Sequence, residues 1–497
     1  MSLKINIIAN YASQLYVTAV GILILPLYIK YMGAEAYGLV GFFTMLQAWF
    51  ALLDLGLTPT IGRETARYRG GAMSSLAYRQ LFRALSMIFA SIALIGGCGL
   101  WLFAEGIASR WLKAGELPMS EVILAVQIMA VSVSLRWMGG LYRGVISGFE
   151  RLVWLSGFNA FIATLRFIAV FLSMWLYGFT PYVFFIHQLV VALLEVASLF
   201  LMSRLLLPGQ VSLGAIGWSI QPVKPFVKFA TTIAFTSAVW ILVTQTDKLI
   251  LSGILSLAEY GYFTLAVLVA SGVMVISGPI SSVIMPRMAR LHSEGKADQV
   301  LQIYRNATRL VSVVCGSAAI TIFVTAETLL FAWTGDRELA KKVAPMLRLY
   351  VAGNAFLVFS AFPYYLQYAF GNLRYHLIGN IILAFVLVPA IIFSATLYGG
   401  IGAGWVWLIL NSLWFFVWVG YIHVKLNLGI HMVWLCRDIL AILIMPLLLA
   451  FAIGGLGFEF SGRLESALWI VIIFSAVFLI SLAGLSFRKI WFKARYE

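Results

Sequence analysis

Long apolar runs follow one another along almost the whole chain, separated by short clusters of charged residues, Gly and Pro. Most runs reach the length of about 20 residues that an α-helix needs to cross a bilayer. The runs and their breaks therefore predict fourteen membrane-spanning helices. Their approximate bounds are 6–32, 37–62, 81–104, 121–145, 153–176, 180–203, 228–254, 258–285, 303–330, 341–369, 374–397, 400–424, 434–456 and 464–485.

Composition excludes the other broad classes. Of 497 residues, 62% are hydrophobic and only 11% are charged, whereas soluble domains carry about a quarter charged residues. The mean hydropathy of +0.98 is incompatible with disorder, and no polar block is long enough to fold as a soluble domain. We therefore predict an all-α integral membrane protein.

The charge distribution predicts the orientation of the spans. The chain has 34 Lys and Arg against 19 Asp and Glu, a net charge of +15. With fourteen spans both termini share one side, which receives 23 Lys and Arg against eight on the other and three inside the membrane. The positive-inside rule places both termini in the cytoplasm. The basic excess then orients the protein and contacts anionic lipids, so no nucleic acid is expected. We interpret the N-terminal segment as the first span, not as a signal peptide.

An internal repeat divides the chain. Tyr37-Gly38 recurs as Tyr260-Gly261 at a spacing of 223 residues, and further weak matches follow in the same order. The unit has six spans, so both copies share one orientation, as in transporters with parallel repeats and alternating access. We predict a first lobe at 1–204, a cytoplasmic linker at 205–227, a second lobe at 228–424, and two extra helices with a basic cytoplasmic tail at 425–497.

Motifs for enzyme chemistry are absent from the sequence. It contains neither GxxxxGK[ST] nor HExxH, and Cys98, Cys315 and Cys436 lie far apart. No loop between the predicted spans exceeds about 25 residues, which leaves little room for a catalytic domain. We expect no enzyme activity, no cofactor and no metal site.

Six ionisable residues fall inside the predicted spans, where charge is costly. They are Asp54, Glu195, Asp247, Arg136, Arg166 and Lys248. One interpretation is structural: they form buried ion pairs that fix helix packing, for example Arg136 with Glu195. The other is functional. Arg136 and Arg143 share a helix face with Gly139 and Gly140 between them, which would let an anionic ligand approach the backbone, and Arg166 reaches similar depth.

Polar residues also lie along the first helix of each repeat. They would either line the cleft between the lobes or form hydrogen bonds with neighbouring helices. They are Asn10, Gln14 and Thr18 in the first span, and Thr236, Ser237 and Thr244 in the seventh.

Several short motifs resemble bacterial polysaccharide flippases of the O-antigen type, in the superfamily of multidrug and toxin exporters and lipid II flippases. They are Pro26-Leu27-Tyr28, Leu53-Asp54-Leu55-Gly56-Leu57, Asp247-Lys248-Leu249-Ile250-Leu251 and the two Tyr-Gly pairs. The resemblance implies two six-helix lobes around a V-shaped central cleft. It implies transport of an oligosaccharide on undecaprenyl pyrophosphate from the cytoplasmic to the external leaflet of the inner membrane. Membrane lipids and the polymerase and chain-length proteins of the same pathway would be further partners.

The resemblance also assigns roles to residues. A cationic lumen would bind the substrate through Arg136, Arg143, Arg166 and Lys248. Coupling to a proton or sodium gradient would need an acid, for which Asp54, Asp247 and Glu195 are candidates. Two alternatives stay open. A multidrug or cation antiporter of the same superfamily would need a net negative charge inside the membrane-spanning cleft. A glycan polymerase would need a large external loop.

Overall fold

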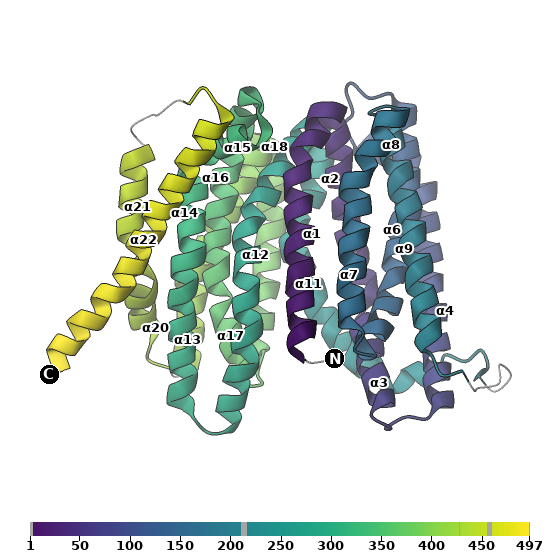
Figure 1. Ribbon diagram of the computed structural model, residues 1–497, viewed down its shortest axis with the longest axis horizontal. Helices are drawn as coiled ribbons and strands as arrows, with labels where there is room; N and C mark the ends of the chain where they lie inside the picture. The colour runs from purple at the N-terminus through teal and green to yellow at the C-terminus, as the bar shows by residue number, and fades with distance from the viewer. Residues whose placement is uncertain (1–2, 210–215, 427, 455–459, 497) are drawn as a thin grey trace. The chain divides into compact units, whose positions relative to one another are not determined.

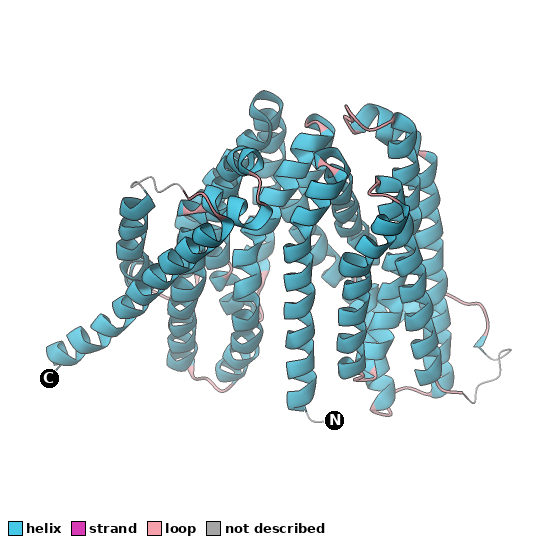
Figure 2. Cartoon of the chain, turned by 45° about the horizontal axis from the view of Figure 1, so that its top comes forward, coloured by secondary structure: helices cyan, strands magenta, loops and turns pink. Residues whose placement is uncertain are grey.

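The protein is described by a computed structural model that covers residues 3–209, 216–426, 428–454 and 460–496. Side chains are not described at 3–7, 228, 229, 232, 233, 236, 282 and 486–496. Almost every described residue is helical, and the described part contains no strand (Figure 2). Among the described residues, twelve helical segments are long and apolar enough to cross a membrane. The predicted all-α membrane fold is confirmed.

The chain forms two compact units, residues 1–261 and 262–497. The first carries the helices that build the site described below (Figure 1). They are α1 (Leu3–Met32), α2 (Ala34–Phe50), η1 (Ala51–Asp54), α3 (Leu57–Arg69), α4 (Ser75–Leu102), α5 (Ala104–Gly106), η2 (Ile107–Trp111), α6 (Met119–Gly148), α7 (Leu152–Ala163), η3 (Thr164–Ala169), α8 (Val170–Tyr177), α9 (Pro181–Leu206), η4 (Gln221–Phe226) and α11 (Val227–Ile254).

Helix α12 (Leu257–Ser293) begins in the first unit and continues into the second. The other helices of the second unit are α13 (Ala297–Val311), η5 (Ser312–Gly316), α14 (Ser317–Val324), α15 (Ala326–Thr334), α16 (Arg337–Ser360), α17 (Phe362–Ala369), α18 (Arg374–Leu413), η6 (Trp414–Trp418), α19 (Val419–Lys425), α20 (His431–Val433), η7 (Trp434–Leu440), α21 (Ala441–Gly454) and α22 (Arg463–Tyr496). The two units are defined by which residues pack together, whereas the predicted lobes were defined by the sequence repeat. The lobe bounds therefore remain a prediction.

The twelve apolar segments agree with about fourteen spans. The segment Arg374–Lys425 is 52 residues long and contains two predicted spans, which meet at Gly399 with φ 58° and ψ −142°. A Cβ on Gly402 would lie 2.3 Å from the carbonyl oxygen of Ser394. Eight residues of straight helix extend about 12 Å, so the chain turns back at Gly399. Helix α11 is the other predicted span outside the twelve.

The second predicted span is shorter than expected. Its helical run ends at Asp54, because Leu55 and Gly56 adopt positive φ angles of 47° and 71°. The residues from Leu57 onward form a separate helix, α3, whose first turn therefore has free backbone N–H groups next to Asp54.

The two Tyr-Gly pairs of the repeat face one another inside the first unit. A Cβ on Gly38 would lie 2.1 Å from the carbonyl oxygen of Leu257, and one on Gly261 would lie 2.7 Å from the carbonyl oxygen of Ala34. The starts of α2 and α12 thus approach at backbone contact, which only Gly permits at these positions. The repeat motif has a packing role.

Candidate functional site

The site is built on α6, where glycines set how α3 packs. Gly140, Gly144 and Gly148 recur every fourth residue, and a Cβ on any of them would collide with α3. At Gly140 that Cβ would lie 2.9 Å from Oγ1 of Thr58. The glycines were expected to open the backbone to a ligand. Gly140 instead lets α3 lie close against α6, whereas a Cβ on Gly139 would face Leu199 of α9.

Two rows of polar side chains pair between α6 and α9. Arg136 and Arg143 lie seven residues apart on α6, and Gln188 and Glu195 lie seven residues apart on α9. Nη2 of Arg136 donates to Oε1 of Gln188 at 2.6 Å, and Nη2 of Arg143 donates to Oε1 of Glu195 at 2.5 Å. Seven residues make about two helical turns, so residues seven apart lie on the same face of a helix. A single alignment of α6 against α9 therefore brings both pairs together.

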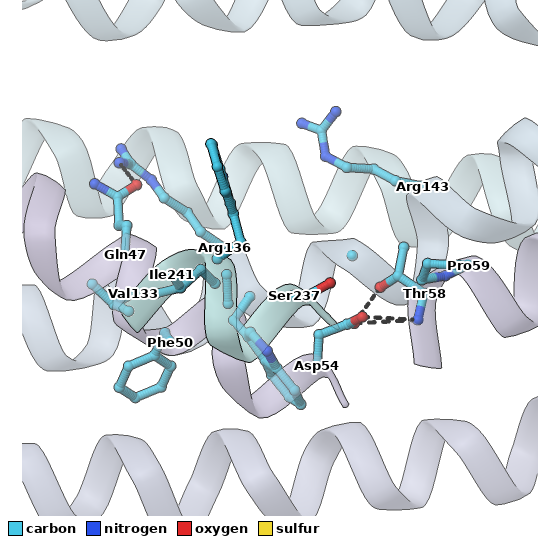
Figure 3. Close-up of a pocket in the computed structure, with 14 residues that line it drawn as sticks. Gln47, Phe50, Asp54, Thr58, Pro59, Val133, Arg136, Arg143, Ser237 and Ile241 are labelled. Carbon is cyan, nitrogen blue, oxygen red and sulfur yellow. Dashed lines mark hydrogen bonds between the residues drawn. The ribbon is translucent and has the colours of Figure 1, made fainter. Parts of the chain in front are cut away.

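Arg136 is held by amides and not by a carboxylate. Its second partner is Oε1 of Gln47 on α2, which accepts from Nη1 at 2.9 Å (Figure 3), and its guanidinium lies 4.9 Å from the ring centre of Phe43. Its Nε is buried and has no hydrogen-bond partner among the residues that the structure describes. Among the described residues no acid forms a salt bridge with Arg136, so its direct hydrogen-bond partners are neutral amides.

Glu195 pairs with two other arginines. It is 3% exposed and accepts from Arg143 through Oε1 and from Arg166 through Oε2. Arg143 also donates to Oδ1 of Asn159 on α7. The structural interpretation of the intramembrane charges thus holds for Glu195, but its partners are Arg143 and Arg166, and not Arg136.

Arg166 lies in a π-helical turn, η3, which interrupts the fifth predicted span. Three side chains from other helices donate to or face the carbonyl oxygens of this turn. Nε2 of Gln188 donates to Arg166 at 2.9 Å, Nε2 of His187 lies 2.9 Å from the carbonyl of Leu165, and the Tyr28 hydroxyl donates to Phe167 at 3.1 Å. π-Turns leave carbonyls without their usual partner and are frequent at functional sites. Gln188 thus links the backbone of Arg166 to the side chain of Arg136.

Asp54 caps the start of α3. Its carboxylate accepts from the backbone N–H of Thr58 at 3.2 and 3.3 Å and from the Thr58 hydroxyl at 2.5 Å (Figure 3). A carboxylate is stabilised there by the free N–H groups and the helix dipole. No basic side chain forms a salt bridge with Asp54 in the described part of the chain.

Two cavities of the first unit collect most of the predicted site residues, and Arg143 lines both. The larger, of about 720 Å³, is lined by the predicted residues Asp54, Arg136, Arg143 and Ser237 and by the aromatic residues Phe50, Trp137 and Trp240. The smaller, of about 390 Å³, is lined by Asn10, Ser13, Gln14, Thr18, Arg143, Asn159 and Arg166. The polar stripe of the first span therefore faces two of the arginines.

The remaining predicted residues lie elsewhere in the first unit. Nζ of Lys248 donates to the carbonyl of Thr244 at 2.7 Å and lies 3.6 Å from Oδ1 of Asp247, which is 1% exposed. The Thr244 hydroxyl donates to the carbonyl of Trp240. None of these three lines either cavity, and the side chain of Thr236 lies outside the described residues.

Comparison with known proteins identifies the family. A family model described as polysaccharide biosynthesis protein matches residues 3–292, more than half of the chain. The chain belongs to this family. EpsK, a membrane protein of Bacillus subtilis (strain 168), is 22% identical over 431 residues, 83% of this chain and 82% of EpsK. A Shigella flexneri protein provisionally named an O-antigen transporter is 20% identical over 419 residues, 82% of this chain and 95% of that protein.

Solved structures share the fold. The lipid II flippase MurJ, in an inward closed conformation, matches with a TM-score of 0.75 and 14% identity over 98% of this chain and 99% of MurJ. An inward-facing multidrug resistance transporter of the MATE family matches with a TM-score of 0.68 and 14% identity, over 84% of this chain and 96% of that transporter. At this identity the likeness shows the fold, whereas the predicted polysaccharide family is confirmed by the family model that matches residues 3–292.

Sequence reasoning missed the neutral residues of the site. Gln47, Asn159 and Gln188 lie inside predicted spans and bond the arginines, but neutral polar residues were considered only in the first and seventh spans. Applying the same reasoning to buried amides would have found them, since each needs a partner at depth.

A second arginine–carboxylate cluster was also missed, in the second unit. Arg305 and Arg309 each donate from Nε to the carboxylate of Asp438 at 2.7 Å, and Asp438 is fully buried. All three residues lie near the start of a predicted span, 303–330 or 434–456, so they were not counted among the residues inside the membrane. The first of these spans was predicted to begin six residues later than its helix does. The segment that contains both arginines is helical from Ala297 to Val324.

Proposed function

We propose that this protein moves an oligosaccharide linked to undecaprenyl pyrophosphate from the cytoplasmic to the external leaflet of the bacterial inner membrane. One observation carries the proposal. Arg136, Arg143 and Arg166 line two cavities of the first unit, and among the described residues only Glu195 pairs with any of them. The surplus positive charge at membrane depth needs an anion.

A pyrophosphate suits this arrangement chemically. Each guanidinium presents donors in a planar fork that matches phosphate oxygens. Arg136 uses one donor on each terminal nitrogen for amide oxygens, which leaves further N–H groups for a ligand. A lone Arg at the midplane costs about 2.5 kcal/mol or more on insertion scales, and an anionic substrate would offset that cost. The O-antigen role given to the Shigella relative supports the same substrate class.

Transport would proceed by alternating access of two pseudo-symmetric lobes, with both termini in the cytoplasm. The predicted ion coupling fits Asp54 best. Its carboxylate lines the larger cavity with the arginines, and its hydrogen bonds with the described residues all come from Thr58. Glu195, by contrast, is occupied by two arginines. The homologous transporters support a transport role and not catalysis.

A second candidate, export of organic cations, has one observation in its favour. Asp54 lines a cavity that also presents Phe50, Trp137 and Trp240, and aromatic faces with a carboxylate attract large cations. The two arginines in the same cavity oppose this function, because they would repel such a ligand.

Ligand binding to the purified protein separates the two functions. We expect a polyprenyl pyrophosphate to bind more tightly than the matching monophosphate, and Arg136→Gln to weaken pyrophosphate binding at least tenfold. The matched control Arg110→Gln changes an exposed arginine outside both cavities and should have no effect. Equal affinity for both phosphates, or tight binding of tetraphenylphosphonium that Asp54→Asn abolishes, would overturn the proposal.

A further inference from the structure

A separate basic cavity lies in the second unit, between the helix pair α15–α16 and the pair α21–α22. It encloses about 320 Å³. Arg337, Lys341 and Arg348 of α16 line it, together with one acid, Glu327 of α15. Its wall thus holds three positive charges against one negative charge.

Membrane topology does not explain these charges. They belong to the side of the membrane that we predict to be external, which holds only eight Lys and Arg. Three of those eight line this one cavity. The positive-inside rule accounts for basic residues on the opposite side, so the concentration here calls for another explanation.

The charged groups of the wall are largely available to a ligand. Lys341 and Glu327 have no ion pair or hydrogen bond with the described residues. Within the described part of the chain, Arg348 donates only from Nε, to the carbonyl of Phe323 at 3.3 Å. Arg337 donates from Nη2 to the carbonyl of Phe460 at 2.5 Å, and its guanidinium lies 4.7 Å from the ring centre of Phe331. Carbonyl and ring contacts position the guanidinium groups without neutralising them.

The cavity is held in place by contacts between its walls. Arg463, at the start of α22, donates to the carbonyls of Ala332 and Trp333 at 3.1 and 2.9 Å, which ties α22 to the end of α15. Asp336 caps α16 by accepting from the backbone N–H of Leu339 at 3.0 Å. The basic groups thus extend from a fixed frame.

The opposite wall is mostly apolar. Ile453 of α21 and Trp469 and Ile473 of α22 line it, with Ser466 as the one polar side chain of α22. Along the same helices Phe451 and Leu468 are 50% and 56% exposed. Apolar surface exposed on a membrane protein faces lipid chains. A ligand that places an anionic group on α16 can therefore extend hydrocarbon along α21 and α22.

We propose that this cavity binds the phosphate of an anionic membrane phospholipid, with its acyl chains against α21 and α22. The site belongs to the second unit and is independent of the transported substrate proposed above. The bound lipid would link α16 to the two helices that follow the repeat.

Native mass spectrometry of the full-length, delipidated protein with phosphatidylglycerol or phosphatidylcholine tests the site. We expect preferential binding of phosphatidylglycerol. Each basic residue near an anionic lipid contributes about a fivefold change in affinity, so Lys341→Gln and Arg337→Gln should each weaken binding by about that factor. Glu327→Gln should strengthen it, an effect that misfolding would not produce.

The next residue along α16 provides a matched control. Lys342 is exposed and lies over the ring of Tyr262, 5.8 Å from its centre, outside the cavity. Lys342→Gln should therefore leave binding unchanged. Equal binding of the two lipids, equal loss in Lys341→Gln and Lys342→Gln, or no gain in Glu327→Gln would overturn the proposal. Displacement of the lipid by equimolar inorganic phosphate would overturn its assignment as a lipid site.

Discussion

Replacement of Glu195 by Gln tests whether the buried arginine cluster holds the first unit together. The carboxylate is 3% exposed and is shared by Arg143 and Arg166. Gln keeps the shape of Glu but leaves both guanidinium groups without a counter-charge. Removing one partner of a buried ion pair costs about 3–5 kcal/mol, and we expect a loss of unfolding free energy in that range.

A double-mutant cycle identifies the partner. Arg166→Leu combined with Glu195→Leu removes both charges of one pair. The double mutant should therefore lose about 0.5–3 kcal/mol less unfolding free energy than the two single mutants lose together. Arg136→Leu with Glu195→Leu should show a smaller interaction energy, because Arg136 bonds Gln47 and Gln188 instead.

The assay is thermal or denaturant unfolding of the purified protein in detergent, with exposed Glu105→Gln as the control. A change of less than about 1 kcal/mol in Glu195→Gln would refute the structural role of the cluster. A larger interaction energy for Arg136 than for Arg166 would show that the pairing described above is wrong.

Three further predictions concern packing, coupling and topology. Gly38→Ala should destabilise the protein by about 1–3 kcal/mol, because the new Cβ would lie 2.1 Å from the Leu257 carbonyl oxygen; Gly99→Ala, which meets nothing within 4 Å, is the control in an unfolding assay. Asp54→Asn should abolish gradient-driven transport but keep protein level and substrate binding, measured in vesicles. Reporter fusions in loop 105–120 should report an external location.

Each of these has a contradicting outcome. Equal stability of the Gly38→Ala and Gly99→Ala variants would exclude a close contact between α2 and α12. Full gradient-driven transport by Asp54→Asn would remove Asp54 as the coupling acid. A cytoplasmic signal from loop 105–120 would contradict the predicted orientation.

The fold was predictable because span length and apolar composition are properties of single segments. Breaks inside the spans were not. The chain stays apolar through Leu55-Gly56-Leu57, so nothing in the pattern marks the positive φ angles that end the helix there. Likewise, the turn at Gly399 depends on one residue, although its position between two predicted spans was anticipated.

The sequence predicts how deep the site residues lie in the membrane, but not which side chains they bond. Counting residues from the membrane boundary placed Arg136 and Arg166 at similar depth, yet which partners each meets depends on how α6, α9 and η3 are rotated and shifted. The seven-residue spacing of Arg136 and Arg143 contains part of the answer, because Gln188 and Glu195 repeat it on α9. The π-turn at Arg166 has no signature in the apolar pattern.

Transport by the reconstituted protein tests the central claim most directly. Proteoliposomes would carry a fluorescent oligosaccharide on undecaprenyl pyrophosphate, and quenching from outside would report its arrival in the outer leaflet. We predict that the wild-type protein and Arg110→Gln move the lipid at equal rates, and that Arg136→Gln reconstitutes normally but moves it at least tenfold more slowly. Transport by Arg136→Gln at the wild-type rate would contradict the claim that the arginines of the first unit bind the pyrophosphate.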